Sequence, residues 1–194
     1  EKHGIEALIV ACNTATSAAV AELRIKYPNL PIVGIEPALK PAVNNSKDGK
    51  ILVMATPLTL KEAKFHKLLD RYRDKREIEP VPCGGLMEYV EQGILEGDEL
   101  DDYLREKLKP FMDSKISSIV LGCTHYPFVK NAIEKVVGQD VDIIDGSLGT
   151  ARELMRRLKE KDLLNDSKEK GTIEMINSSN KQELIDLSWK LIEM

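Results

Sequence analysis

The sequence predicts an α/β protein with two similar parallel-sheet domains, helices on both faces of each sheet, and an active site between the domains. Two observations support this fold class. Short runs that are almost wholly apolar alternate with longer amphipathic stretches. Strands with so few polar positions are typical of parallel sheets, which are buried on both faces. The chain has 194 residues, enough for one large or two small domains with real cores.

Each element follows from this alternation. We expect strands at residues 5–11, 30–35, 50–55, 78–81, 117–121, 141–144 and 172–176. Between and after them, helices are expected at 14–26, 58–71, 85–92, 99–111, 127–137, 148–160 and 181–192. Pro57 suits a first helical turn. Residues 1–3 read as the last turn of a helix that Gly4 closes.

Domain boundaries are expected where the alternation is interrupted. One break falls at Glu36-Pro37-Ala38 and the other at Asp145-Gly146. We therefore predict a first domain formed by residues 1–36 together with 146–194. Residues 37–145 would form a second, inserted domain.

Composition excludes several classes of function. The formal net charge is −4, and charged residues (31%) are spread through the chain without a basic stripe, so a nucleic-acid partner is not expected. No apolar run approaches the roughly 20 residues of a membrane span. Three cysteines favour the reducing cytoplasm over a disulfide framework. Without CxxC or HExxH spacing, no metal site is predicted.

Two cysteines occupy matching positions at the ends of predicted strands. Cys12 follows the apolar run 8–11 and precedes Asn13 and Thr14, while Cys123 follows 119–122 and precedes Thr124 and His125. Ligands of open parallel sheets bind beyond the carboxyl ends of the strands. A helix N-terminus after each cysteine would favour a thiolate and a bound carboxylate. A third cysteine, Cys83, lacks polar residues after it and is read as structural.

Two opposed thiols suit one reaction class. To invert a carbon centre, one group removes a proton from one face and another returns a proton to the opposite face. An unperturbed thiol titrates near ~8.5, so modest shifts let one thiol be ionised while its partner stays protonated. A racemase or epimerase is therefore indicated.

The same motifs resemble a known family. Ala11-Cys12-Asn13-Thr14-Ala15 and Gly122-Cys123-Thr124-His125-Tyr126-Pro127 resemble the two signature motifs of bacterial glutamate racemases, in the cofactor-independent aspartate/glutamate racemase superfamily. The resemblance runs along the chain, and further similar segments are Gly34-Ile35-Glu36-Pro37, Ala55-Thr56-Pro57, Val90-Glu91-Gln92-Gly93 and Ile144-Asp145-Gly146.

The resemblance implies a two-thiol racemisation of glutamate, a small-molecule substrate, with no pyridoxal phosphate or other cofactor. Cys12 and Cys123 would act on opposite faces of the α-carbon, and His125 would assist Cys123. The substrate's charged groups would be bound by Asn13, Thr14, Thr124 and His125, with Thr56 in the wall of the site. The product, D-glutamate, would serve peptidoglycan synthesis and hence cell shape in the bacterial cytosol.

Two family features are not found in this sequence. Family members begin with a strand that ends in an Asp-Ser-Gly-type motif and carry a Pro-Tyr-Gly segment before the first cysteine. Neither is present here, a difference on the order of 60 residues at ~30 residues per βαβ unit. The Asp would assist Cys12, so these residues alone are expected to be impaired. An exposed sheet edge would also favour a homodimer.

Alternatives remain open. Within the superfamily, an aspartate, hydantoin or other amino-acid racemase is the nearest. Cys123 with His125 also fits the nucleophile and base of a hydrolase, and a catalytically inactive binding remnant is a third reading. Glu91 is read as a surface carboxylate that the resemblance places near His125. His66 is expected in solvent and Trp189 in the core of the last helix.

Overall fold

The structure is a computed structural model that describes residues 4–179 and 181–193. The helical turn predicted for residues 1–3 lies outside the described residues. Gly4 has a positive φ of 56°, the conformation expected of a glycine that ends a helix. Among the described residues, none of the helices is long and apolar enough to cross a membrane.

The larger of the two sheets in the described chain is four-stranded, parallel, and ordered β4-β3-β5-β6. Its strands are β3 (Lys50–Ala55), β4 (Ile78–Pro82), β5 (Ile116–Leu121) and β6 (Asp142–Asp145). The two central strands are the most apolar and are almost completely buried. β4 carries two prolines and lies at an edge, where missing N–H donors are tolerated.

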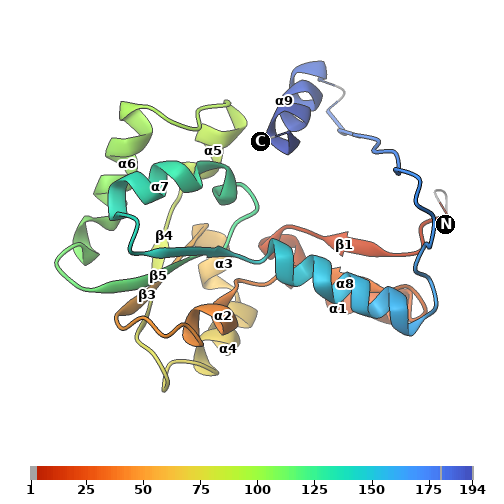
Figure 1. Ribbon diagram of the computed structural model, residues 1–194, viewed down its shortest axis with the longest axis horizontal. Helices are drawn as coiled ribbons and strands as arrows, with labels where there is room; N and C mark the ends of the chain where they lie inside the picture. Colours follow the sequence, from red (N-terminus) through yellow and green to blue (C-terminus); the bar gives the residue numbers. More distant parts are fainter. Residues whose placement is uncertain (1–3, 180, 194) are drawn as a thin grey trace.

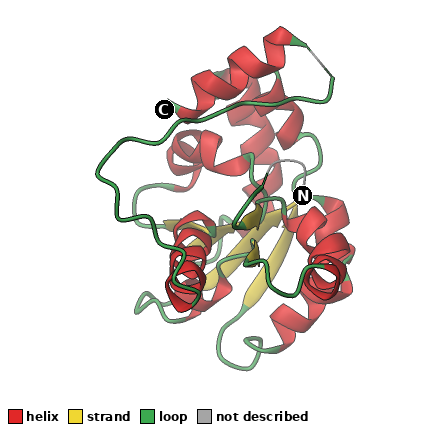
Figure 2. Cartoon of the chain, turned by 90° about the vertical axis from the view of Figure 1, so that its right-hand side faces the viewer, coloured by secondary structure: helices red, strands yellow, loops and turns green. Residues whose placement is uncertain are grey.

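Helices cover both faces of this sheet (Figures 1 and 2). On one face lie α5 (Leu86–Glu91), α6 (Asp98–Leu108) and α7 (Lys130–Val137). On the other lie α2 (Leu39–Val43), α3 (Pro57–Lys61) and α4 (Ala63–Asp70). Because side chains alternate along β3, Leu52 and Met54 join the first apolar cluster, whereas Ile51 and Val53 join the second. This double core fixes the ends of β3 and β5.

The smaller sheet pairs only two strands within the described residues. β1 (Leu8–Val10) runs parallel to β2 (Ile32–Gly34), with α1 (Asn13–Lys26) as the crossover. The other edge of β1 has no described strand beside it, and the Ile9 side chain on this strand is 39% exposed. α1 and α8 (Ser147–Glu160) lie beside this sheet (Figure 1).

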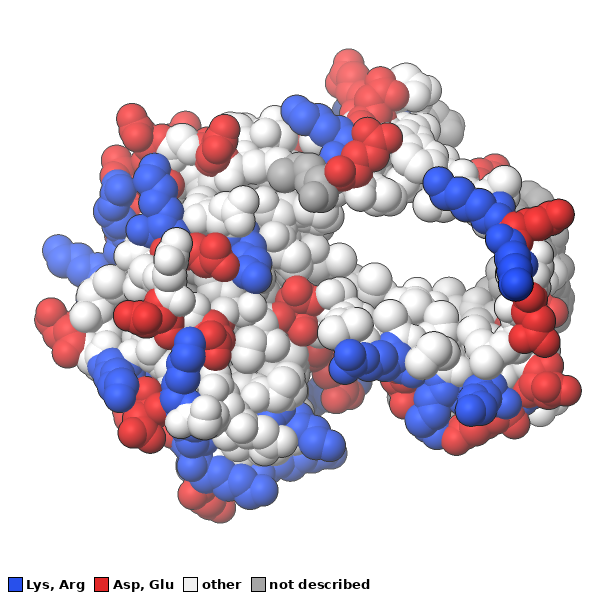
Figure 3. All heavy atoms as spheres, in the orientation of Figure 1, with Lys and Arg blue, Asp and Glu red and all other residues white. Residues whose placement is uncertain are grey.

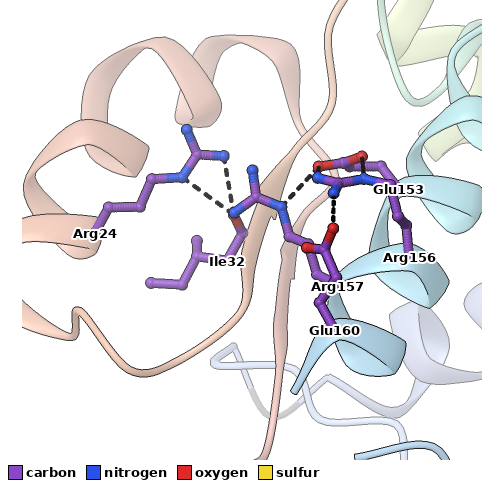
Figure 4. Close-up of polar contacts among 6 residues, drawn as sticks. All are labelled: Arg24, Ile32, Glu153, Arg156, Arg157 and Glu160. Carbon is purple, nitrogen blue, oxygen red and sulfur yellow. Dashed lines mark hydrogen bonds and ion pairs between the residues drawn. The ribbon is translucent and has the colours of Figure 1, made fainter. Parts of the chain in front are cut away.

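Polar contacts join α1 to β2 and link side chains within α8 (Figure 4). The Arg24 guanidinium on α1 donates two hydrogen bonds to the carbonyl of Ile32, with N···O distances of 3.1 and 2.9 Å. On α8, the Glu153 carboxylate accepts hydrogen bonds from both Arg156 and Arg157. None of the residues of α8 is fully buried. These ion pairs lie within α8, so they stabilise the helix itself and do not join it to the smaller sheet.

The C-terminal part of the chain returns to the larger sheet. After α8 a long segment without regular structure leads to α9 (Gln182–Ile192), whose Leu191 packs on the cluster that includes α5 and α6. Figure 3 shows an opening in the molecule between this returning segment and the β1–α8 side.

The prediction of an α/β fold with parallel sheets and flanking helices is confirmed. The predicted strand at 172–176 is wrong, because the segment has β-forming residues but no described neighbour with which to form a ladder. The predicted helix 58–71 is divided at Glu62, whose backbone is extended, and α2 was missed. Trp189 is half-buried, not in the core, because α9 only rests on the surface. The domain boundaries stay a prediction.

Candidate active site

Cys12 lies where β1 ends and α1 begins. Its backbone is extended (φ −95°, ψ 128°), it occupies the N-cap position of α1, and its carbonyl accepts a hydrogen bond from the Thr16 N–H at 2.8 Å. The Cys12 side chain is exposed, and no hydrogen bond to its sulfur is found within the described residues. The next residue, Asn13, is only 6% exposed, and its buried Oδ1 has no partner there either. The predicted position of this thiol at a strand end and helix start is confirmed.

Cys123 lies at the end of β5, a central strand with a neighbour on each side. The preceding Gly122 donates its N–H to the carbonyl of Met54 at 2.7 Å. A Cβ on Gly122 would lie 3.0 Å from the Ala55 Cβ, so only glycine fits without a shift of β3. Cys123 is half-buried, and this loop is therefore more tightly enclosed than that of Cys12.

Burial raises the pKa of the Cys123 thiol above its ordinary value. The main-chain N–H groups of His125, Thr124 and Tyr126 donate toward the sulfur and lower the pKa, whereas the nearby Cys12 raises it. The sequence placed a helix directly after Cys123, but residues 126–129 form a 3₁₀ turn and α7 begins only at Lys130. The loop's own N–H groups, not a helix terminus, therefore stabilise this thiolate, and burial outweighs them.

His125 connects Cys123 to α5. The distance from His125 Nδ1 to Cys123 Sγ is 3.8 Å, and that from His125 Nε2 to Glu91 Oε1 is 3.4 Å. Glu91 is the last residue of α5, and half of its side chain is exposed. Glu91 is therefore a surface carboxylate, as expected, and it also reaches His125, as the resemblance implied.

A chain of threonines joins the Cys12 loop to the end of β3. The hydroxyls of Thr14 and Thr59 are 3.0 Å apart, and Thr56 Oγ1 donates to Thr59 Oγ1 at 3.0 Å. Thr56 also caps α3 by accepting the Thr59 N–H. Thr59 is buried and was not singled out from the sequence, although its position three residues after the N-cap Thr56 is a recognisable capping pattern.

One hydrogen bond brings the two cysteine loops together. The Thr124 hydroxyl donates to the carbonyl of Ala11 at 2.5 Å, so the residues next to the two thiols are in direct contact. The structure thus gathers the predicted site residues at the carboxyl ends of β1, β3 and β5, namely Cys12, Asn13, Thr14, Thr56, Cys123, Thr124 and His125.

A pocket adjoins this cluster on the side of α4. Asn13 and Thr59 line it together with the basic residues Lys64, Lys67 and Arg71, but neither Cys12 nor Cys123 does. Across residues 4–179 and 181–193, no group of three or more His, Cys, Asp or Glu side chains is placed to hold a metal ion.

The sequence profile of the family described as Asp/Glu/Hydantoin racemase matches residues 1–154 of the chain. The chain belongs to this family. Among its relatives, the glutamate racemase of Clostridium perfringens is 54% identical over 193 residues, which cover 100% of this chain and 74% of that protein. The glutamate racemase of Clostridium acetobutylicum is 52% identical, with 100% and 75% covered.

Solved structures agree with this assignment. Glutamate racemase from Francisella tularensis in complex with D-glutamate superposes with a TM-score of 0.78 at 25% identity, covering 100% of this chain and 72% of that one. The Escherichia coli glutamate racemase, in complex with L-glutamate and the activator UDP-MurNAc-ala, also gives a TM-score of 0.78 at 26% identity, with 97% and 71% covered. The family fold is therefore shared along the whole chain.

Proposed function

We propose that this chain is a glutamate racemase that interconverts L- and D-glutamate with Cys12 and Cys123 as the two acid–base groups. The observation that carries the proposal is the hydrogen bond from Thr124 to Ala11, which holds the two thiol loops against each other. The relatives named above are glutamate racemases, and one of the solved structures contains D-glutamate. Opposed thiols and an amino-acid substrate define the reaction.

The two-base step balances without a cofactor. A thiolate on one face removes the α-proton and becomes a thiol, and the electron pair stays on the substrate carbon. The thiol on the opposite face then gives its proton to that carbon and becomes a thiolate. Burial raises the pKa of Cys123, so at neutral pH it carries its proton and is suited to be the donor. In the reverse reaction the two thiols exchange their roles as proton donor and proton acceptor.

The neighbouring polar groups match a substrate with one ammonium and two carboxylate groups. The unpaired Asn13 Oδ1 is an acceptor for an ammonium N–H. The Thr14 hydroxyl and His125 provide donors for carboxylates, and His125 also lies next to the Cys123 sulfur, where it assists this thiol. The Thr124 hydroxyl already donates to Ala11, so its oxygen is an acceptor for the substrate ammonium. The Thr56 hydroxyl is already bonded to Thr59, so Thr56 contributes to the wall of the site.

The wider setting of the enzyme belongs to the same proposal. D-glutamate would supply peptidoglycan synthesis in the bacterial cytoplasm, and residues 1–36 with 146–194 would form one domain and 37–145 the other. On the face in Figure 3 acidic and basic side chains are interspersed, which favours a small-molecule substrate over nucleic acid. The open edge of β1 favours a homodimer, and sedimentation as a pure monomer would contradict this last point.

Solvent exchange at the substrate carbon tests the reaction. The chain is incubated with L-glutamate in D₂O, loss of the α-proton is followed by NMR, and D-glutamate is measured by chiral chromatography. We expect both signals above a protein-free blank. Cys12→Ser and Cys123→Ser are each expected to remove them, a loss of at least about a hundredfold, because each thiol performs one proton transfer. Cys83→Ala is the matched control, since its buried thiol lies outside the site.

The outcomes separate the readings. Exchange well below the rate of the C. perfringens relative is expected, because no described group assists Cys12; an equal rate would contradict the predicted impairment. A hydrolase using Cys123 and His125 would not exchange the α-proton. Glutamate binding without exchange would identify an inactive binding remnant and refute racemisation by these residues.

A further inference from the structure

Tyr126, which begins the turn after Cys123, is fully buried. It has no exposed surface, and its hydroxyl donates a hydrogen bond to the main-chain carbonyl of Cys83 at 2.8 Å. A buried tyrosine hydroxyl that lost this partner would be left unsatisfied, so the bond is costly to break. The 3₁₀ turn after β5 is thereby fixed to the loop after β4.

The same residue also faces the thiol through its backbone. The Tyr126 N–H donates to the Cys123 carbonyl at 3.2 Å, and the main-chain N–H groups of Thr124, His125 and Tyr126 lower the pKa of the Cys123 thiol. Successive N–H groups in a turn can form an anion-binding concavity. Its shape depends on the turn that Tyr126 begins.

Cys83, the partner of the Tyr126 hydroxyl, is also connected to the site through α5. Cys83 lies just before α5, and its carbonyl also accepts the N–H of Leu86, the first residue of that helix. Glu91 at the other end of α5 reaches His125, which in turn contacts Cys123. The Tyr126 hydroxyl and the Glu91–His125 contact therefore hold the thiol loop against the two ends of one short helix.

We propose that Tyr126 is a positioning residue for Cys123: its buried hydroxyl holds the turn whose N–H groups stabilise the thiolate. Tyr126 does not touch the substrate; it acts through the loop. The inference deepens the proposed function, because it concerns the thiol assigned there to one proton transfer. Thiol reactivity is measurable without turnover, so a failure of the racemase proposal leaves the test intact.

Site-resolved alkylation tests the proposal. The whole chain is treated with iodoacetamide between pH 6 and 10, and the labelling of each cysteine is quantified by mass spectrometry. In Tyr126→Phe we expect the pH midpoint of Cys123 labelling to rise by roughly half to one unit, and its rate at neutral pH to fall about three- to tenfold. Cys12 in the same molecule should be unaffected. The ionisable groups around the two residues are His125, Cys12 and Cys83 near the thiol, with Glu91 in contact with His125, and Cys83, Tyr103 and Glu88 near the Tyr126 hydroxyl.

A matched variant separates positioning from general stability. Tyr103 on α6 also donates its hydroxyl to a carbonyl of the loop after β4, that of Gly84 at 2.9 Å. It lies near Tyr126, but within the described residues it makes no hydrogen bond to the Cys123 turn. Tyr103→Phe should leave the Cys123 midpoint unchanged. Replacement of Tyr126 by 4-aminophenylalanine restores a donor at the same place and should restore the wild-type midpoint, whether or not the phenylalanine variant folds well.

Three results would overturn the proposal. The first is wild-type labelling of Cys123 in Tyr126→Phe. The second is faster labelling of Cys123 together with labelling of the buried Cys83, because a merely structural tyrosine would loosen both sites. The third is a 4-aminophenylalanine variant that behaves like the phenylalanine variant.

Discussion

The two cysteine loops have nearly the same sequence pattern but very different supports. Cys123 follows a central strand, its preceding glycine packs directly on β3, and its thiol is half-buried among three main-chain N–H groups. Cys12 follows a three-residue strand that is paired on one side only within the described chain, and its thiol is exposed. Two similar sequence motifs therefore give two thiols that differ in burial and in structural support.

The difference shows which parts of the structure set the pKa and the exposure of each thiol. For Cys123 burial and loop geometry set the pKa, and both come from the double core around β3 and β5. Cys12 receives from the described residues only its place at the start of α1. The hydrogen bond from Thr124 to Ala11 joins the well-supported Cys123 loop to the Cys12 loop.

Thiol labelling should show the largest difference. Burial raises the pKa of Cys83 to about 12 from its ordinary 9.0, so its thiolate fraction at neutral pH is lower by about a thousandfold. With a single dose of iodoacetamide at pH 7.5 we expect Cys12 to react first, Cys123 more slowly and Cys83 only after unfolding. Labelling of Cys123 before Cys12 would contradict the conclusion that the Cys12 thiol is the more exposed of the two.

Core truncation should show the next largest difference. Leu52 on β3 is fully buried, whereas Ile9 on β1 is 39% exposed. Leu52→Ala should lower the free energy of unfolding by about 2–5 kcal/mol through lost burial and a cavity. Ile9→Ala should cost less than about 1 kcal/mol, since its site is open to water. Urea unfolding of both variants is the measurement, and equal losses would show that β1 is covered in solution.

Much of this fold could be predicted because buried positions are apolar, and they recur along the sequence with the repeat of a strand or of a helix. The apolar run 50–55 identified β3 without error, and the two cysteine motifs identified two loops that the structure brings into contact. The failures share a cause: they depend on contacts between distant segments. Residues 172–176 have strand-forming side chains, but a strand also needs a neighbour. Thr59 and the bond from Tyr126 to Cys83 became visible only when the loops after β3, β4 and β5 were placed together.

The smallest effect should come from the charge network within α8, the helix that lies beside the smaller sheet. Hydrogen bonds from Arg156 and Arg157 lower the pKa of Glu153 from 4.5 to about 2. A carboxylate with a depressed pKa stabilises the folded state above its unfolded pKa, and this contribution disappears as the pH falls from about 4.5 to about 2. Because the Glu153 side chain is 34% exposed, solvent screening limits the effect to under about 1 kcal/mol.

Glu153→Gln should therefore lower the Tm slightly at pH 7, and the difference from wild type should shrink as the pH falls below about 4.5. The control is Glu22→Gln on α1, an exposed carboxylate for which no ion pair is found among the described residues; it should change the Tm little at any pH. A difference for Glu153→Gln that stays constant down to pH 3 would mean that packing of the side chain, rather than its charge, supports α8.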